Sequence, residues 1–148
     1  MPRPITLAGA QLGPIHKADS RESVVKRLCD LMRRAHGKGA NLVVFPELAL
    51  TTFFPRWYME GQQEVDTWFE TEMPNAATMP LFELAASLKI GFYLGYAEKC
   101  VEDGETHRYN TAILVDQDGK IVGKYRKVHM PGHSEFVPTY PWQHLEKR

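Results

Sequence analysis

The sequence predicts an α/β fold, in which a sheet with parallel strands is covered by helices. Short apolar segments that end at glycine or proline alternate with longer segments whose apolar residues recur at helical spacing. The first three segments follow the order strand, helix, strand, and such a crossover is typical of parallel pairing. The chain of 148 residues is long enough for one domain with a substantial core and too short for two ordinary domains.

The N-terminal third supplies this strand–helix–strand unit. Residues 5–12 are mostly apolar and end at a Gly-Pro pair, which predicts a buried first strand. Asp19, with Glu22 three residues later, is typical of a helix start, because such side chains bond the free backbone N–H groups of the first turn. Apolar residues at helical spacing continue until Gly37. Residues 42–45 then predict a second strand.

The remaining elements are predicted in the same way. The aromatic-rich residues 51–73 predict a loop and then a short helix at residues 64–70, and residues 79–89 predict an amphipathic helix. Three further strands are expected at residues 91–97, 109–115 and 120–125, with turns at residues 102–105 and 116–119. Residues 127–148 contain three prolines and predict an ordered loop. Because a parallel sheet needs helices on both faces and only two good helices are visible, one side of the layer is expected to be missing.

Composition excludes several classes of function. Lys+Arg and Asp+Glu each number 18, and the resulting net charge of zero does not favour nucleic acid or a membrane surface as a partner. No apolar segment approaches the roughly 20 residues of a membrane span. The N-terminus lacks the pattern of a signal peptide, so a cytoplasmic location is expected. Two cysteines are too few for a fold organised by disulfides.

Two charged residues at predicted strand ends are candidates for chemistry. Glu47 follows the second strand, and ligands of open α/β sheets bind beyond such ends. Its apolar neighbours predict partial burial, which would raise the pKa of the carboxyl and suit a general base, although a solvated carboxylate in a turn is the alternative. Lys127 follows the last strand, where a fixed cation can stabilise an oxyanion. Alternatively, Lys127 extends a basic sheet edge formed with Lys124 and Arg126.

The histidines and cysteines do not predict a metal site or a nucleophile. His129 and His133 are four residues apart, but the Pro-Gly pair between them forbids a helix that would present both to zinc. Cys29 falls within the predicted helix as a small core residue. Cys100 has only Lys99 as an electropositive neighbour, so neither cysteine is assigned as a nucleophile.

Several segments resemble the nitrilase (carbon-nitrogen hydrolase) superfamily. These are FPELALTTFFPRW around Glu47 and GKYRKVHMPGH around Lys127, together with ETEMP, IGFYLGYAE, YNTAILVD and QHLEKR. The resemblance is greatest to the branch of N-carbamoyl-D-amino acid amidohydrolases. It implies an α-β-β-α sandwich of which this chain is roughly the N-terminal half. Residues 1–148 would then be a carbon-nitrogen hydrolase domain that is incomplete at its C-terminus.

The resemblance also implies catalytic roles. Members of the family use a Cys-Glu-Lys triad without metal or another cofactor. Glu47 would be the general base, Lys127 would stabilise the tetrahedral intermediate, and Glu146 would be the second glutamate that positions the lysine and the substrate. The nucleophilic cysteine of the family belongs to a segment beyond the position of Glu146. This chain ends at Arg148, so the chain alone is expected to be inactive.

The same resemblance implies a substrate and an assembly. The residues that resemble the substrate-binding pocket and its entry loop are His129, His144, Pro131 and Gly132. The expected partner is a small-molecule N-carbamoyl amino acid, and the relatives' dimers and tetramers imply a homo-oligomer. The aromatic side chains of Phe53, Phe54 and Trp57 fit either a pocket wall or plain core packing.

The function predicted for the complete enzyme is hydrolysis of N-carbamoyl-D-amino acids to the D-amino acid, ammonia and carbon dioxide. One alternative keeps the superfamily and changes the substrate, giving an amidase, a β-ureidopropionase or a nitrilase. The other alternative is a non-catalytic fragment that acts in assembly or binding, because a half-sandwich would expose apolar sheet surface.

Overall fold

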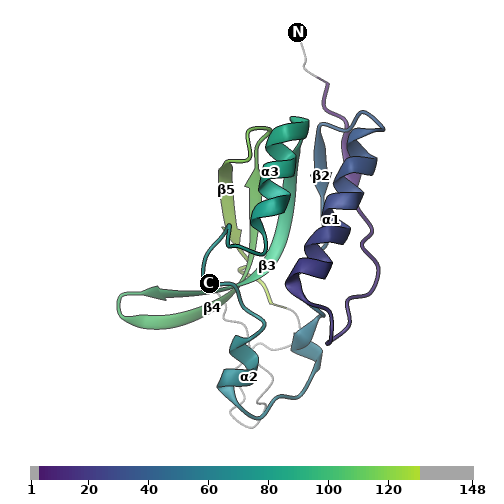
Figure 1. Cartoon of the computed structure of the whole chain (residues 1–148). Coiled ribbons are helices and arrows are strands. Elements are labelled where there is room, and N and C mark those ends of the chain that lie inside the picture. Colours follow the sequence, from purple (N-terminus) through teal and green to yellow (C-terminus); the bar gives the residue numbers. More distant parts are fainter. Residues whose placement is uncertain (1–3, 131–148) are drawn as a thin grey trace.

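The structure, a computed structural model, describes residues 4–130 as a five-stranded sheet with helices packed against it (Figure 1). The strands follow the chain order β1 (Leu7–Gly9), β2 (Leu42–Val44), β3 (Gly91–Glu102), β4 (Glu105–Val115) and β5 (Ile121–Arg126). The first three strands are parallel, and β3, β4 and β5 pair antiparallel in turn. The α/β fold class predicted from the sequence is confirmed, although the sheet is mixed.

The helical segments are α1 (Arg21–His36), the 3₁₀ turn η1 (Phe54–Arg56), α2 (Gln62–Asp66) and α3 (Met79–Leu88). The start predicted for α1 was one residue early. Ser20 is the N-cap, and its hydroxyl accepts a hydrogen bond from the Ser23 N–H at 3.2 Å. The Asp19 carboxylate instead accepts from the His16 N–H at 2.9 Å and so closes the preceding turn.

The other differences in element bounds arise from pairing across the sheet. The helix expected to reach Glu70 ends at Asp66, because Glu70 joins β3 in an isolated bridge. β3 and β4 extend well beyond their apolar segments as one hairpin. Its two turn residues, Asp103 (φ 53°) and Gly104 (φ 84°), both have the positive φ that suits a tight hairpin. β1 covers only three of the eight residues predicted.

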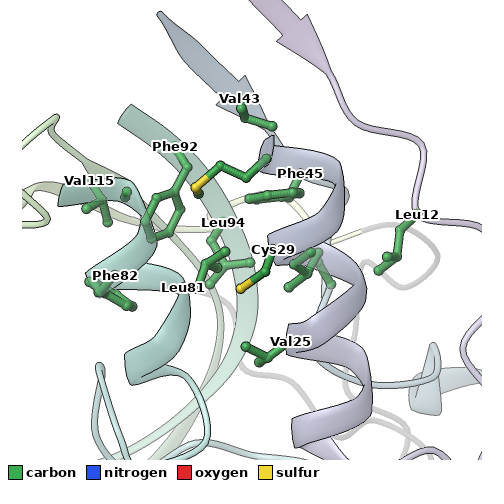
Figure 2. Packing of buried hydrophobic residues seen from close by; sticks show 14 of the residues in the cluster. Leu12, Val25, Cys29, Val43, Phe45, Leu81, Phe82, Phe92, Leu94 and Val115 are labelled. Carbon is green, nitrogen blue, oxygen red and sulfur yellow. The ribbon is translucent and has the colours of Figure 1, made fainter. Parts of the chain in front are cut away.

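The main hydrophobic core lies between the sheet and the pair of helices α1 and α3 (Figure 2). Alternate residues of β3 point to opposite faces, and Phe92 and Leu94 face the helices, where Phe92 packs edge-on against Phe82 of α3. Cys29 of α1 is part of this core, as its position in the sequence predicted. A smaller cluster packs η1 and α2 against β3 near Ala97.

The opposite face of the sheet carries exposed apolar side chains. Val44, Tyr93 and Leu114 are direct cross-strand neighbours on β2, β3 and β4, and each is exposed over more than a third of its surface. Within residues 4–130 this face is covered only in part, because η1 and α2 pack on it near Ala97. In that part of the chain, no helix has the length and apolar character needed to cross a membrane.

Candidate active site

The loop after β2 holds Glu47 directly against the backbone of β3. Leu48 adopts a positive φ of 49°, and the Ala49 N–H then donates to the Gly95 carbonyl at 2.8 Å. A Cβ atom at Gly95 would lie 3.0 Å from both the Glu47 Cα and the Leu48 nitrogen. Such a contact is tighter than most Cβ atoms make, so glycine at position 95 lets the Glu47 backbone pack closely against β3.

Glu47 meets two donors from distant parts of the chain. Its Oε1 atom accepts hydrogen bonds from Asn110 Nδ2 at 2.6 Å and from Lys127 Nζ at 2.7 Å. Asn110 lies on β4 and is buried, and the Lys127 N–H donates to the Asn110 carbonyl at 2.8 Å, one residue beyond the end of β5. The structure therefore brings Glu47 and Lys127 together.

The net electrostatic effect on Glu47 differs from the prediction. Burial raises the pKa of the Glu47 carboxyl, but the hydrogen bonds from Lys127 and Asn110 and the charge of Lys127 outweigh it. The pKa therefore lies below its usual range, and the prediction that it would be raised was wrong. Desolvation is the largest single contribution, and only the three lowering contributions together exceed it. At neutral pH this carboxylate is ionised and able to accept a proton.

A cavity of about 230 Å³ lies beside Glu47. Residues 12–15, which follow β1, and residues 46–56, which follow β2, provide its walls. Both loops follow the carboxyl ends of parallel strands, where ligands bind in open α/β sheets. Arg27 of α1 fixes the first wall, because its guanidinium donates to the carbonyl oxygens of Leu12 and Pro14 at 2.7 and 2.9 Å.

The three aromatic residues after Glu47 have different environments. Phe53 is half exposed and lines the cavity, as expected for a wall residue. Phe54 is fully buried in the smaller core cluster, where its ring stacks on Trp68. Trp57 is partly exposed, and the cationic groups of Lys17 and Arg56 lie 4.9 and 4.7 Å from its ring centroid.

The remaining predicted site residues lie at or beyond the end of the described chain. His129 is exposed, and no hydrogen bond joins it to another residue of the range 4–130. Glu146, His144, Pro131 and Gly132 lie outside the described residues, so their roles stay predictions. Within residues 4–130, no group of three or more His, Cys, Asp or Glu side chains could hold a metal ion.

Neither cysteine is placed to act with Glu47. Cys29 is buried between α1 and α3, and Cys100 of β3 accepts a hydrogen bond from Arg126 Nη2 at 3.2 Å. Gly95 and Cys100 are separated by an odd number of positions, which puts the two on opposite faces of β3. Burial raises the pKa of both thiols, which disfavours the thiolate that a nucleophile needs.

A charged cluster anchors the end of β5 that leads into Lys127. Glu98 of β3 accepts hydrogen bonds from Arg126 at 2.8 and 3.0 Å, from Lys124 and from the Thr111 hydroxyl at 2.7 Å. Burial raises the pKa of Glu98, but these bonds lower it to about 2. Arg126 is only 10% exposed and is paired with Glu98, so it does not contribute to the basic sheet edge considered as the alternative for Lys127.

Asn110 is the site residue that sequence analysis missed. It is the one amide side chain within the apolar segment YNTAILV, and a buried amide requires hydrogen-bond partners. That signal is present in the sequence. The identity of its partner, Glu47, follows only from the register of β3 and β4.

Comparisons with known proteins agree with this fold. A family profile described as carbon-nitrogen hydrolase matches residues 6–146. A formamidase of Bacillus cereus is 28% identical, and the match covers 88% of this chain and 37% of the formamidase. An N-carbamoylputrescine amidase of Arabidopsis thaliana is 31% identical, and the match covers 68% of this chain and 31% of the amidase. The structure of a carbon-nitrogen hydrolase from Helicobacter pylori superposes with a TM-score of 0.66 and 25% identity, over 86% of this chain and 40% of that one. The chain thus spans about a third of the length of these curated relatives.

Proposed function

Because the chain belongs to the carbon-nitrogen hydrolase family, we propose that it carries the base and the oxyanion-stabilising lysine of an enzyme that hydrolyses N-carbamoyl-D-amino acids. The observation that carries this proposal is the shared contact at Glu47. One carboxylate oxygen accepts hydrogen bonds from both Lys127 Nζ and Asn110 Nδ2, beside a cavity at the ends of parallel strands. A base and a fixed cation within hydrogen-bond distance can serve acyl transfer.

The reaction needs a thiol from outside residues 1–148. The chain has two cysteines, and neither contacts Glu47. Cys29 is buried in the core, and Cys100 accepts a hydrogen bond from Arg126 of the Glu98 cluster. The resemblance to the family supplies a cysteine from a further segment. We therefore expect residues 1–148 alone to show no turnover.

Glu47 and Lys127 would act in sequence. Glu47 takes the proton of the thiol, and the thiolate attacks the carbamoyl carbon. Lys127 stabilises the resulting oxyanion. A preorganised donor of this kind lowers the activation free energy by about 3–4 kcal/mol. The amino group of the tetrahedral intermediate takes up the proton held by Glu47 and leaves as ammonia. Water, deprotonated by Glu47, then attacks the S-carbamoyl carbon, and the cysteine sulfur leaves and takes this proton back. The released carbamic acid decomposes to carbon dioxide and the amino acid.

The carbamoyl substrate has separate support. The segment FPELALTTFFPRW resembles the N-carbamoyl-D-amino acid branch, and the Arabidopsis relative is named for a carbamoyl substrate. The formamidase of Bacillus cereus, at similar identity, supports the alternative of a plain amide. The D-configuration rests on the sequence resemblance alone.

Ammonia release from a substrate panel tests the proposal on the complete polypeptide that contains these residues. The panel contains N-carbamoyl-D-amino acids, their L-enantiomers, plain amides and nitriles. Glu47→Gln should lower kcat by about 10²- to 10⁴-fold, and Lys127→Met by about 10²- to 10³-fold. The matched controls Glu83→Gln and Lys26→Met change exposed helix residues and should retain activity. Preference for nitriles or plain amides would refute the substrate, and an active Glu47→Gln variant would refute the site.

The open sheet face favours the second candidate, a non-catalytic assembly module. Val44, Tyr93 and Leu114 form an exposed apolar row of the kind that marks association surfaces. Under this candidate, Tyr93→Lys would shift the complete polypeptide to a smaller species in analytical ultracentrifugation, and Glu47→Gln would leave every measured property unchanged. An unchanged sedimentation coefficient in Tyr93→Lys counts against it.

A further inference from the structure

Asn110 contacts both Glu47 and Lys127, with different parts of the same residue. Its side-chain amide donates to Glu47 Oε1 at 2.6 Å, and its backbone carbonyl accepts from the Lys127 N–H at 2.8 Å. The residue is buried on β4. Because β4 lies between β3 and β5 in the sheet, Asn110 is the point at which the loop after β2 and the segment after β5 meet.

The two carboxylate oxygens of Glu47 have different hydrogen-bond partners. Oε1 accepts from both Asn110 and Lys127, and these two donors occupy the two lone-pair positions that one carboxylate oxygen offers. Among residues 4–130, no donor forms a hydrogen bond to Oε2. Of the two oxygens, Oε2 is the one that residues 4–130 leave free to exchange a proton with an incoming thiol or water.

We propose that Asn110 is a positioning residue that holds Oε1 of Glu47 against Lys127 and so presents Oε2 as the proton-accepting oxygen. This inference rests on the proposed function and deepens it. Without the amide, Lys127 alone would tether Oε1, and the half-exposed carboxylate could rotate to present either oxygen. The base would then spend less time in the reactive orientation, although the substrate would still bind.

The chemistry of the position requires an amide. Aspartate has the same shape but would place a second carboxylate at 2.6 Å from Glu47, and alanine would remove the donor without adding charge. Both substitutions keep the backbone carbonyl that accepts from Lys127. Arg56 is a further charged residue that lines the cavity beside Glu47.

Asn75 offers a matched control. Its Nδ2 donates to Glu70 Oε2 at 2.7 Å, so it forms the same amide-to-carboxylate contact at a place remote in sequence from Glu47 and Lys127. Its side-chain oxygen also accepts from the N–H groups of Ala77 and Thr78. Asn75→Ala is therefore at least as disruptive to local structure, but it should leave Glu47 unaffected.

The test combines a titration with kinetics, both on the complete polypeptide. The carboxyl carbon of Glu47 is followed by ¹³C NMR against pH in wild type, Asn110→Ala, Asn110→Asp and Asn75→Ala. Asn110→Ala should move the Glu47 titration to higher pH, because a donor to the charged form is lost, and Asn110→Asp should move it further. Asn75→Ala should not move it.

The kinetic arm uses the best substrate of the panel. Asn110→Ala should lower kcat by about 10- to 100-fold with little change in KM, and the acidic limb of the pH profile should move in the direction of the NMR titration. If Asn110→Ala leaves the Glu47 titration in place, or if Asn75→Ala moves it equally, the inference is overturned. A shifted titration in a protein that turns over none of the substrates would support the positioning of Glu47 while refuting the proposed function.

Discussion

Replacing Glu98 with glutamine should remove a large and pH-dependent part of the free energy of unfolding. The carboxylate is 8% exposed and accepts hydrogen bonds from Arg126, Lys124 and Thr111. Its pKa is about 2 in the folded chain, against an ordinary value of 4.5. Because one pH unit corresponds to about 1.4 kcal/mol, this lowering is worth about 3 kcal/mol at neutral pH.

The sign of the effect sets the pH window. A carboxyl whose pKa is lowered by folding stabilises the native state above its unfolded pKa, and this contribution is lost as the pH falls through the folded value. For Glu98, the contribution is complete above about pH 4.5 and disappears towards pH 2. Glu98→Gln should thus be destabilised by about 3 kcal/mol at pH 7 and should approach the wild type at the acidic end. Removing one partner of a buried ion pair typically lowers the free energy of unfolding by a similar amount.

Urea unfolding at pH 7, 4.5 and 3 measures this difference. The comparison of variant with wild type at each pH cancels the contributions of other carboxyl groups, such as Asp66. Glu83→Gln, on the exposed side of α3, controls for the chemical change itself. A difference below about 0.5 kcal/mol at pH 7, or one that stays constant from pH 7 to pH 3, would refute the role assigned to Glu98.

Two further predictions concern the surroundings of the site. Gly95→Ala should destabilise the fold by about 1–3 kcal/mol and lower kcat, because the new Cβ meets the Glu47 backbone at 3.0 Å. Gly123→Ala in β5, whose Cβ would meet only the Leu114 side chain at 3.6 Å, is the control, and equal losses of kcat in both variants would count against the reasoning. Asp66→Asn should speed amide exchange in α2 by about tenfold, since the carboxylate binds Lys99 and Arg108 at 2.7 Å; unchanged exchange in α2 would contradict this.

The parts of the fold that the sequence predicted are those set by local pattern. The helical spacing of apolar residues identified α1 and α3, and the strand–helix–strand order identified the parallel pairing of β1 and β2. The place of Glu47 directly after an apolar strand made it a candidate, and the family resemblance then assigned it the role of the base.

The parts that the sequence did not predict depend on pairing between distant segments. The β3–β4 hairpin extends into polar sequence, where Lys99 and Arg108 are neighbours on adjacent strands and both bind Asp66. The pKa of Glu47 is lowered first by Lys127 and then by Asn110, which lie 80 and 63 positions away. Neither set of contacts follows from the apolar pattern, because the register of the strands decides which polar side chains meet.

A double-mutant cycle on Glu47 and Lys127 tests the central claim most directly. The value of kcat is measured for Glu47→Gln, Lys127→Met and the double variant of the complete polypeptide, with an N-carbamoyl-D-amino acid as the substrate. Residues that act as one catalytic unit are strongly non-additive, so the double variant should be no slower than the slower single variant, within about threefold. Fully additive losses, or a single variant with wild-type kcat, would contradict the account.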